Sequence, residues 1–96
     1  MAVFADPFVL NANRKMNLSE LTRAIRMDIA AEQEAIGLYE AHADACPNKD
    51  AAKILKDIAE EEKVHVHELQ IVLYMLDSEE SKAKDQAGSE VTKLLG

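Results

Sequence analysis

A chain of 96 residues is long enough for one small domain, and its composition, with no Trp, two Tyr and two Phe, favours helices over a β-sandwich or barrel. A formal net charge of -7 argues against nucleic acid or an anionic membrane surface as a partner. Cys46 is the single cysteine, which excludes an intrachain disulfide and gives no sign of an oxidising compartment. We therefore expect residues 1–96 to form a single all-α domain.

Residues 1–17 are expected to form an arm that precedes the first helix. Phe4 and Phe8 supply two of the aromatic side chains, so the arm is expected to pack against its own chain or a neighbouring subunit. No basic n-region is present, and no stretch approaches the ~20 apolar residues of a membrane span. The sequence thus predicts neither a signal peptide nor a membrane helix, and we expect a cytoplasmic protein.

Two long helices are predicted on either side of a short turn. Asn17 with Glu20 three residues later matches a capping box, so the first helix is expected to span 18–45. Pro47 ends it, because proline disfavours helical geometry in the preceding residue. The turn is short, so the second helix, 50–77, is expected to run antiparallel to the first.

A short third helix and a tail are predicted over 78–96. The acidic start favours a polar helix over 78–87, and Gly88 with Ser89 is expected to break it. Two long helices alone leave one flank of each uncovered. We therefore expect two copies of the hairpin to associate as a four-helix bundle.

Each long helix carries an apolar row at alternating steps of three and four residues, which predicts a buried face. Glu32 interrupts the first row, and Glu62 with His65 interrupts the second, at similar distances from the turn. A buried carboxylate or imidazole is costly unless it is paired, hydrogen-bonded or bound to a metal. The predicted rows are Leu18, Leu21, Ile25, Ile29, Glu32, Ile36, Tyr39 and Ala43, and Ala51, Leu55, Ile58, Glu62, His65, Leu69, Val72 and Leu76.

The spacing Glu62-x-x-His65 indicates a metal site, because residues three apart project from one face of a helix. Four-helix di-iron proteins take a Glu from each of two helices and Glu-x-x-His from each of the other two. With Glu32, this chain supplies half of that set. We therefore expect a di-iron centre completed by a second copy. Tyr39, two turns beyond Glu32, is expected to be a core residue, a hydrogen-bond donor to a ligand or an electron donor.

Other polar residues near these rows are assigned lesser roles. Glu34 points well away from Glu32 and is a candidate for a metal-uptake surface. Asp28 lies one turn before Glu32, where it is a candidate hydrogen-bond partner of a ligand or of the arm of a neighbour. Glu61 is expected to be solvated or to act between subunits, His67 is expected at the surface or at an interface, and His42 is expected at the surface.

These residues resemble the encapsulated ferritins, half-length members of the ferritin-like group. The resemblance covers about residues 18–76 and rests on Glu32, Glu34, Tyr39 and the run Glu61-Glu62-Lys63-x-His65. It implies a ferroxidase that oxidises Fe(II) to Fe(III) with dioxygen, with two irons held by Glu32, Glu62 and His65 of two chains. Tyr39 is implied to sit beside the centre.

The resemblance also implies dimers that assemble into a ring of ten and deliver iron into an encapsulin compartment, where a C-terminal targeting peptide holds them. This chain has Ala31 where the family often has an acidic uptake residue, and Leu38 where it has an aromatic one. Residues 88–96 offer a linker and apolar side chains but no clear targeting peptide.

Two alternatives use the same residues without catalysis. In the first, the ligands bind Zn(II) or Mn(II) in a metal-stabilised or metal-sensing helical assembly. In the second, the chain is a structural helical oligomer in which the charges are paired as buried salt bridges. Oxygen consumption on adding Fe(II) distinguishes a ferroxidase from both.

Overall fold

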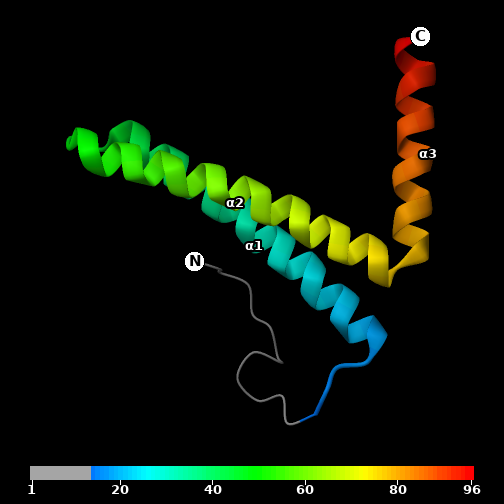
Figure 1. The fold of residues 1–96 in the computed structure, drawn as a ribbon. Helices are drawn as coiled ribbons and strands as arrows, with labels where there is room; N and C mark the ends of the chain where they lie inside the picture. The colour runs from blue at the N-terminus through cyan, green and yellow to red at the C-terminus, as the bar shows by residue number, and fades with distance from the viewer. Residues whose placement is uncertain (1–13) are drawn as a thin grey trace.

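The computed structural model describes residues 14–96, so the predicted arm lies almost wholly outside the described residues. Three helices make up this part of the chain: α1 (Leu18–Ala45), α2 (Lys49–Leu76) and α3 (Ser78–Leu95). α1 and α2 lie side by side and antiparallel, while α3 turns steeply away from the end of α2 (Figure 1). No strand occurs between residues 14 and 96. The all-α prediction is confirmed, and both long helices begin and end within one residue of the predicted bounds.

The start of α1 is fixed by the predicted capping box. The side-chain oxygen of Asn17 accepts from the Glu20 N–H at 2.9 Å, and the Glu20 carboxylate accepts from the Asn17 N–H at 3.0 Å. Arg14 donates to both carboxylate oxygens of Glu20 at 2.8 Å. The Arg14 hydrogen bond, followed by that of the Asn17 N–H, lowers the pKa of Glu20 to about 2. The Glu20 carboxylate of the capping box therefore stays charged throughout the ordinary pH range.

A short turn reverses the chain between α1 and α2. The Cys46 N–H donates to the Ala43 carbonyl at 3.3 Å, and Pro47 follows outside the helix. Asn48 caps α2, since its side-chain oxygen accepts from the Ala51 N–H at 2.9 Å. The thiol of Cys46 donates to the Asn48 carbonyl at 3.3 Å, so this cysteine stabilises the turn.

The buried face of the hairpin differs from the predicted one. Of the predicted rows, Ala43 alone is buried, most other members are half-buried, and Leu18 and His65 are exposed. Small alanines let the helices approach closely, and the larger apolar side chains flank this contact. On α2, each buried residue lies one position after a predicted one, a rotation of about 100°. The buried residues are Ala24, Ala35 and Ala43 of α1 and Ala59, Val66 and Leu73 of α2.

The expected break at Gly88 and Ser89 is wrong, because α3 runs without interruption from Ser78 to Leu95. A glycine inside a helix costs only about 1 kcal/mol relative to alanine. Gln86 donates to Glu90 across the glycine at 3.0 Å, and the Thr92 hydroxyl donates to the Gly88 carbonyl itself at 2.9 Å. The C-terminal end of α3 is apolar and exposed, with Val91, Leu94 and Leu95 at the surface.

None of the three helices in the described part combines the length and hydropathy that crossing a membrane requires.

A single residue, Asp77, separates α2 from α3 and has an extended backbone. One of its carboxylate oxygens caps α3 by accepting from the Glu79 and Glu80 N–H groups at 3.0 and 3.4 Å. The other accepts from Arg26 of α1 at 3.5 Å, and Arg26 also donates to the Glu80 carboxylate at 3.0 Å. The Asp77 carboxylate therefore both caps α3 and links the start of this helix to α1.

Replacing Asp77 with Ala should let α3 continue straight from α2 more often. The change removes a cap worth about 1 kcal/mol and inserts a strong helix former, which shifts the ratio of bent to straight chains about fivefold. Spin labels at Lys53→Cys and Lys93→Cys, in a Cys46→Ser background, should report a longer distance. Ser78→Ala is the matched control, because it leaves the carboxylate in place. An unchanged distance distribution in Asp77→Ala would show that other contacts direct α3.

Candidate metal centre

The hairpin brings together the three residues that the sequence singled out. Glu32 lies in the middle of α1, and Glu62 and His65 lie one turn apart on α2. One ligand atom from each lies within 4.8 Å of the others. His65 Nδ1 is 3.6 Å from Glu62 Oε2 and 3.8 Å from Glu32 Oε2. The similar distances of these residues from the turn thus place them at the same height.

These separations suit a shared cation better than direct hydrogen bonds. Both exceed the range of an N–H to oxygen hydrogen bond. Two ligand atoms each about 2.1 Å from one ion lie about 3.0 to 3.5 Å apart, depending on the coordination angle. Small side-chain movements would therefore bring the imidazole and both carboxylates onto one ion.

A buried oxygen of Glu32 supports the fit of a cation. Glu32 Oε2 is buried and has no hydrogen-bond partner among residues 14–96. Leaving a charged oxygen in this state is costly, because the water it loses is not replaced. The oxygen lies on the side of Glu32 that faces His65. A cation held there would supply the missing partner.

A pocket of about 400 Å³ adjoins this cluster. Glu32 and Glu62 line it, Tyr39 contributes to its wall, and no lysine or arginine is among the lining residues. The cluster lies toward the open side of the hairpin: the side chains of Glu62, Glu32 and His65 are 19%, 29% and 50% exposed. The remaining lining residues are Asp28, Ala31, Ala35 and Leu69.

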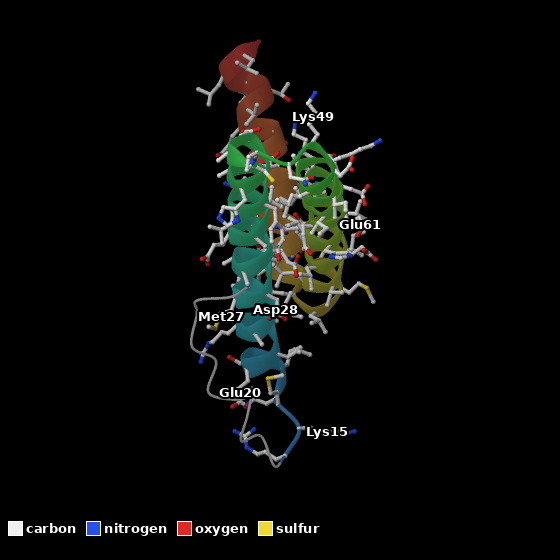
Figure 2. All side chains as sticks on the ribbon, turned by 90° about the vertical axis from the view of Figure 1, so that its left-hand side faces the viewer. Lys15, Glu20, Met27, Asp28, Lys49 and Glu61 are labelled. Carbon is white, nitrogen blue, oxygen red and sulfur yellow. The ribbon has the colours of Figure 1, made fainter. Side chains whose placement is uncertain are left out.

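The other polar residues considered from the sequence lie outside the cluster. Glu61 is exposed and points away from α1 on the outer side of α2 (Figure 2). Glu34 is half-buried on α1 and is not among the residues that gather around Glu32. His67 is exposed and lines a different pocket, and His42 is exposed near the end of α1. Asp28, assigned a ligand-supporting role from its spacing, is the one residue of this group that lines the pocket.

Comparison with known proteins places this arrangement in a family. A family model described as Rubrerythrin matches residues 3–73. The chain belongs to the rubrerythrin family. This rubrerythrin-family protein is also similar to the crystal structure of the encapsulated ferritin domain from Pyrococcus furiosus, with 34% identity and a TM-score of 0.82. That likeness covers 97% of this chain and 95% of the other, so the resemblance to the encapsulated ferritins is confirmed.

The names of two relatives refer to encapsulins. The encapsulin nanocompartment cargo protein EncC of Myxococcus xanthus is 40% identical over 82 residues, which cover 85% of this rubrerythrin-family chain and 63% of EncC. The ferritin-like–encapsulin shell fusion protein of Pyrococcus furiosus is 36% identical over 91 residues, which cover 95% of this chain and 26% of the fusion protein. The chain thus spans less than two thirds of the length of either relative.

Proposed function

We propose that this rubrerythrin-family protein is a ferroxidase that oxidises Fe(II) to Fe(III) with dioxygen, in iron storage or detoxification. The observation that carries the proposal is the buried Glu32 Oε2, which has no hydrogen-bond partner among residues 14–96 and lies 3.8 Å from His65 Nδ1, level with Glu62. Carboxylate oxygen and imidazole nitrogen form a donor set that suits iron. Fe(II) is the substrate, and each ion gives one electron to dioxygen.

The site is proposed to be shared between two copies of the chain. One hairpin supplies two carboxylates and one imidazole, half of the set that four-helix di-iron proteins use. Ile58, Leu69 and Val72 are half-buried on the flank of α2 that carries Glu62 and His65. A second hairpin packed on this flank would cover them and complete the set, with two irons per pair of chains. The burial of apolar side chains and the completion of the ligand set therefore both favour the proposed four-helix bundle.

Each residue of the site is proposed to have a separate role. Glu62 is assigned the bridging position, because His65 one turn later must reach the ion that its own helix already holds. Glu32 would complete the coordination of each ion from the facing helix. Tyr39 shares the pocket, where its hydroxyl is proposed to hydrogen-bond a ligand or supply an electron. Glu34 is proposed to belong to an uptake surface nearer to solvent.

The assembly of the chain is proposed to go beyond a dimer. Dimers are proposed to assemble further, into a decamer, as the resemblance to the encapsulated ferritins implies. The assembly is proposed to reside in an encapsulin nanocompartment in the cytoplasm, and the names of the cargo and shell-fusion relatives support the association with an encapsulin. Oxidised iron would be released into that compartment. Native mass measured alone and after coexpression with an encapsulin shell protein tests both statements, and a free monomer in the two samples contradicts them.

Anaerobic Fe(II) titration followed by exposure to air tests the activity. We expect one iron per chain, oxygen uptake on admission of air and a rise in Fe(III) absorbance faster than in buffer. Stoichiometric binding without faster oxidation would favour the non-catalytic metal-binding assembly. Failure to bind iron would mean that the carboxylates and the imidazole form a structural ion cluster.

A further inference from the structure

We propose that the apolar end of α3 packs into a groove on the hairpin of a second copy of the chain, on the flank opposite to the metal centre. The occupant of the groove is thus the Val91, Leu94 and Leu95 segment of that second copy. This inference deepens the proposed assembly. It rests on the proposed function in that the dimers it would join are those that share the metal centre.

One face of α3 begins in contact with its own hairpin and then runs past it. The Lys84 ammonium lies 5.0 Å from the centre of the Tyr74 ring of α2. Residues three, four and seven apart share a helix face, so the face that carries Lys84 continues through Val91 and Leu94. Beyond this contact α3 diverges from the hairpin (Figure 1), and Val91 and Leu94 are 51% and 84% exposed. The chain's own hairpin therefore leaves this apolar end uncovered.

The hairpin carries a groove of about 370 Å³ beside this contact. Tyr74 and Ile71 line it, and Ile71 is 58% exposed. Val64 and Met75 extend the exposed apolar surface along α2. Exposed apolar surface of this extent is typical of a protein interface. The other lining residues are Gln33, Val66, His67 and Gln70.

The groove and the metal centre lie on opposite sides of the buried row of α2. His65 comes one residue before the buried Val66, whereas Tyr74 comes one residue after the buried Leu73. Each step of one residue turns about 100°, so the two side chains leave the row in opposite directions. The cluster that binds the metal contributes no residue to the groove. One chain can therefore share its metal centre with one copy and its groove with another.

Charge favours the chain itself as the partner of α3. Residues 82–96 carry three lysines against Asp85 and Glu90, a net charge of +1, whereas the whole chain carries -7. Lys93 adjoins the apolar end of α3, and the exposed Glu68 lies in the same row of α2 as Ile71. Apolar and basic groups thus meet apolar and acidic ones. Reciprocal placement of two helices in two grooves closes such a pair about a two-fold axis.

Disulfide trapping between two kinds of chain tests this contact. Both kinds carry Cys46→Ser, one with Ile71→Cys and the other with Leu94→Cys, and the mixture is treated with diamide. We expect the mixed disulfide, identified by intact mass, to form at least about tenfold faster than with Ser89→Cys, because contact raises the effective concentration. Ser89→Cys is the matched control, since residue 89 lies on the opposite face of α3 from Val91.

Leu94→Asp tests the effect on assembly. Loss of one buried leucine should weaken the association of dimers at least about tenfold. Native mass should shift toward the dimer, while iron binding stays at one per chain. Ser89→Asp, which adds the same charge on the opposite face, should keep the wild-type mass.

The other outcomes contradict separate statements. Leu94→Cys chains that trap one another, and not Ile71→Cys, would show that α3 pairs with α3. Equal trapping of Leu94→Cys and Ser89→Cys, or an unchanged mass of Leu94→Asp, would remove the end of α3 from this interface. Loss of retention by a coexpressed encapsulin shell in Leu94→Asp, at wild-type mass, would make the shell the partner and overturn the proposal. If trapping succeeds but wild type binds no iron, the ferroxidase function fails and the interface stands.

Discussion

Replacing Glu62 with Gln should slow Fe(II) oxidation at least about 100-fold. Loss of a group that merely orients a metal ligand typically costs 10- to 100-fold in affinity or activity, so loss of a proposed bridging ligand should cost at least as much. Glutamine preserves the size of the side chain and its place on the open flank of α2, but it removes the charge. The initial rate of Fe(III) absorbance, measured under air at fixed protein concentration, gives the ratio.

The neighbouring glutamate provides the control for this experiment. Glu61→Gln makes the same chemical change one residue away, on the exposed outer side of α2. It should oxidise iron at the wild-type rate, because Glu61 lies outside the cluster of Glu32, Glu62 and His65. Equal losses in the two variants would indicate a general effect of surface charge. Wild-type activity in Glu62→Gln would remove this cluster from the reaction.

Local signals in the sequence were sufficient to predict the long helices and the candidate site. Asn17 with Glu20 and then Pro47 mark the ends of α1, and each acts through a short-range effect that no distant contact overrides. Glu32, Glu62 and His65 could be found because their similar distances from one turn place them together in any antiparallel hairpin. In such a hairpin, residues at equal numbers of positions from the turn lie at the same height along the two helices.

The buried face and the third helix could not be predicted in the same way. α2 has apolar residues on two adjacent rows, so periodicity alone does not decide between Ile58 and Ala59; the close approach that alanine permits decides it. Gly88 misled because a local cost of about 1 kcal/mol is too small to end a helix. The start of α3 also contacts Arg26, which lies far away in the sequence. Long-range contacts of this kind leave no periodic signal.

Removal of metal should lower the melting temperature of the wild-type protein by about 10 to 20 °C. An ion that binds only the folded state stabilises it by about 2.7 kcal/mol when its concentration is 100 times Kd. Each kcal/mol shifts the melting temperature of a domain of this size by about 4 to 8 °C. Melts of chelator-treated protein with and without Co(II) measure the shift. If the ion joins two chains, the midpoint should also rise with protein concentration.

The stability advantage of wild type over Glu62→Gln should disappear when the metal is removed. Without metal, the Glu32 and Glu62 carboxylates repel each other, so Glu62→Gln should melt no lower than wild type. With Co(II), wild type and Glu61→Gln should gain stability, whereas Glu62→Gln should not. If the carboxylates instead formed a structural ion cluster with His65, Glu62→Gln would be destabilised in both conditions. The sign of the change in metal-free protein therefore separates a site built to bind a cation from one built to stabilise the hairpin.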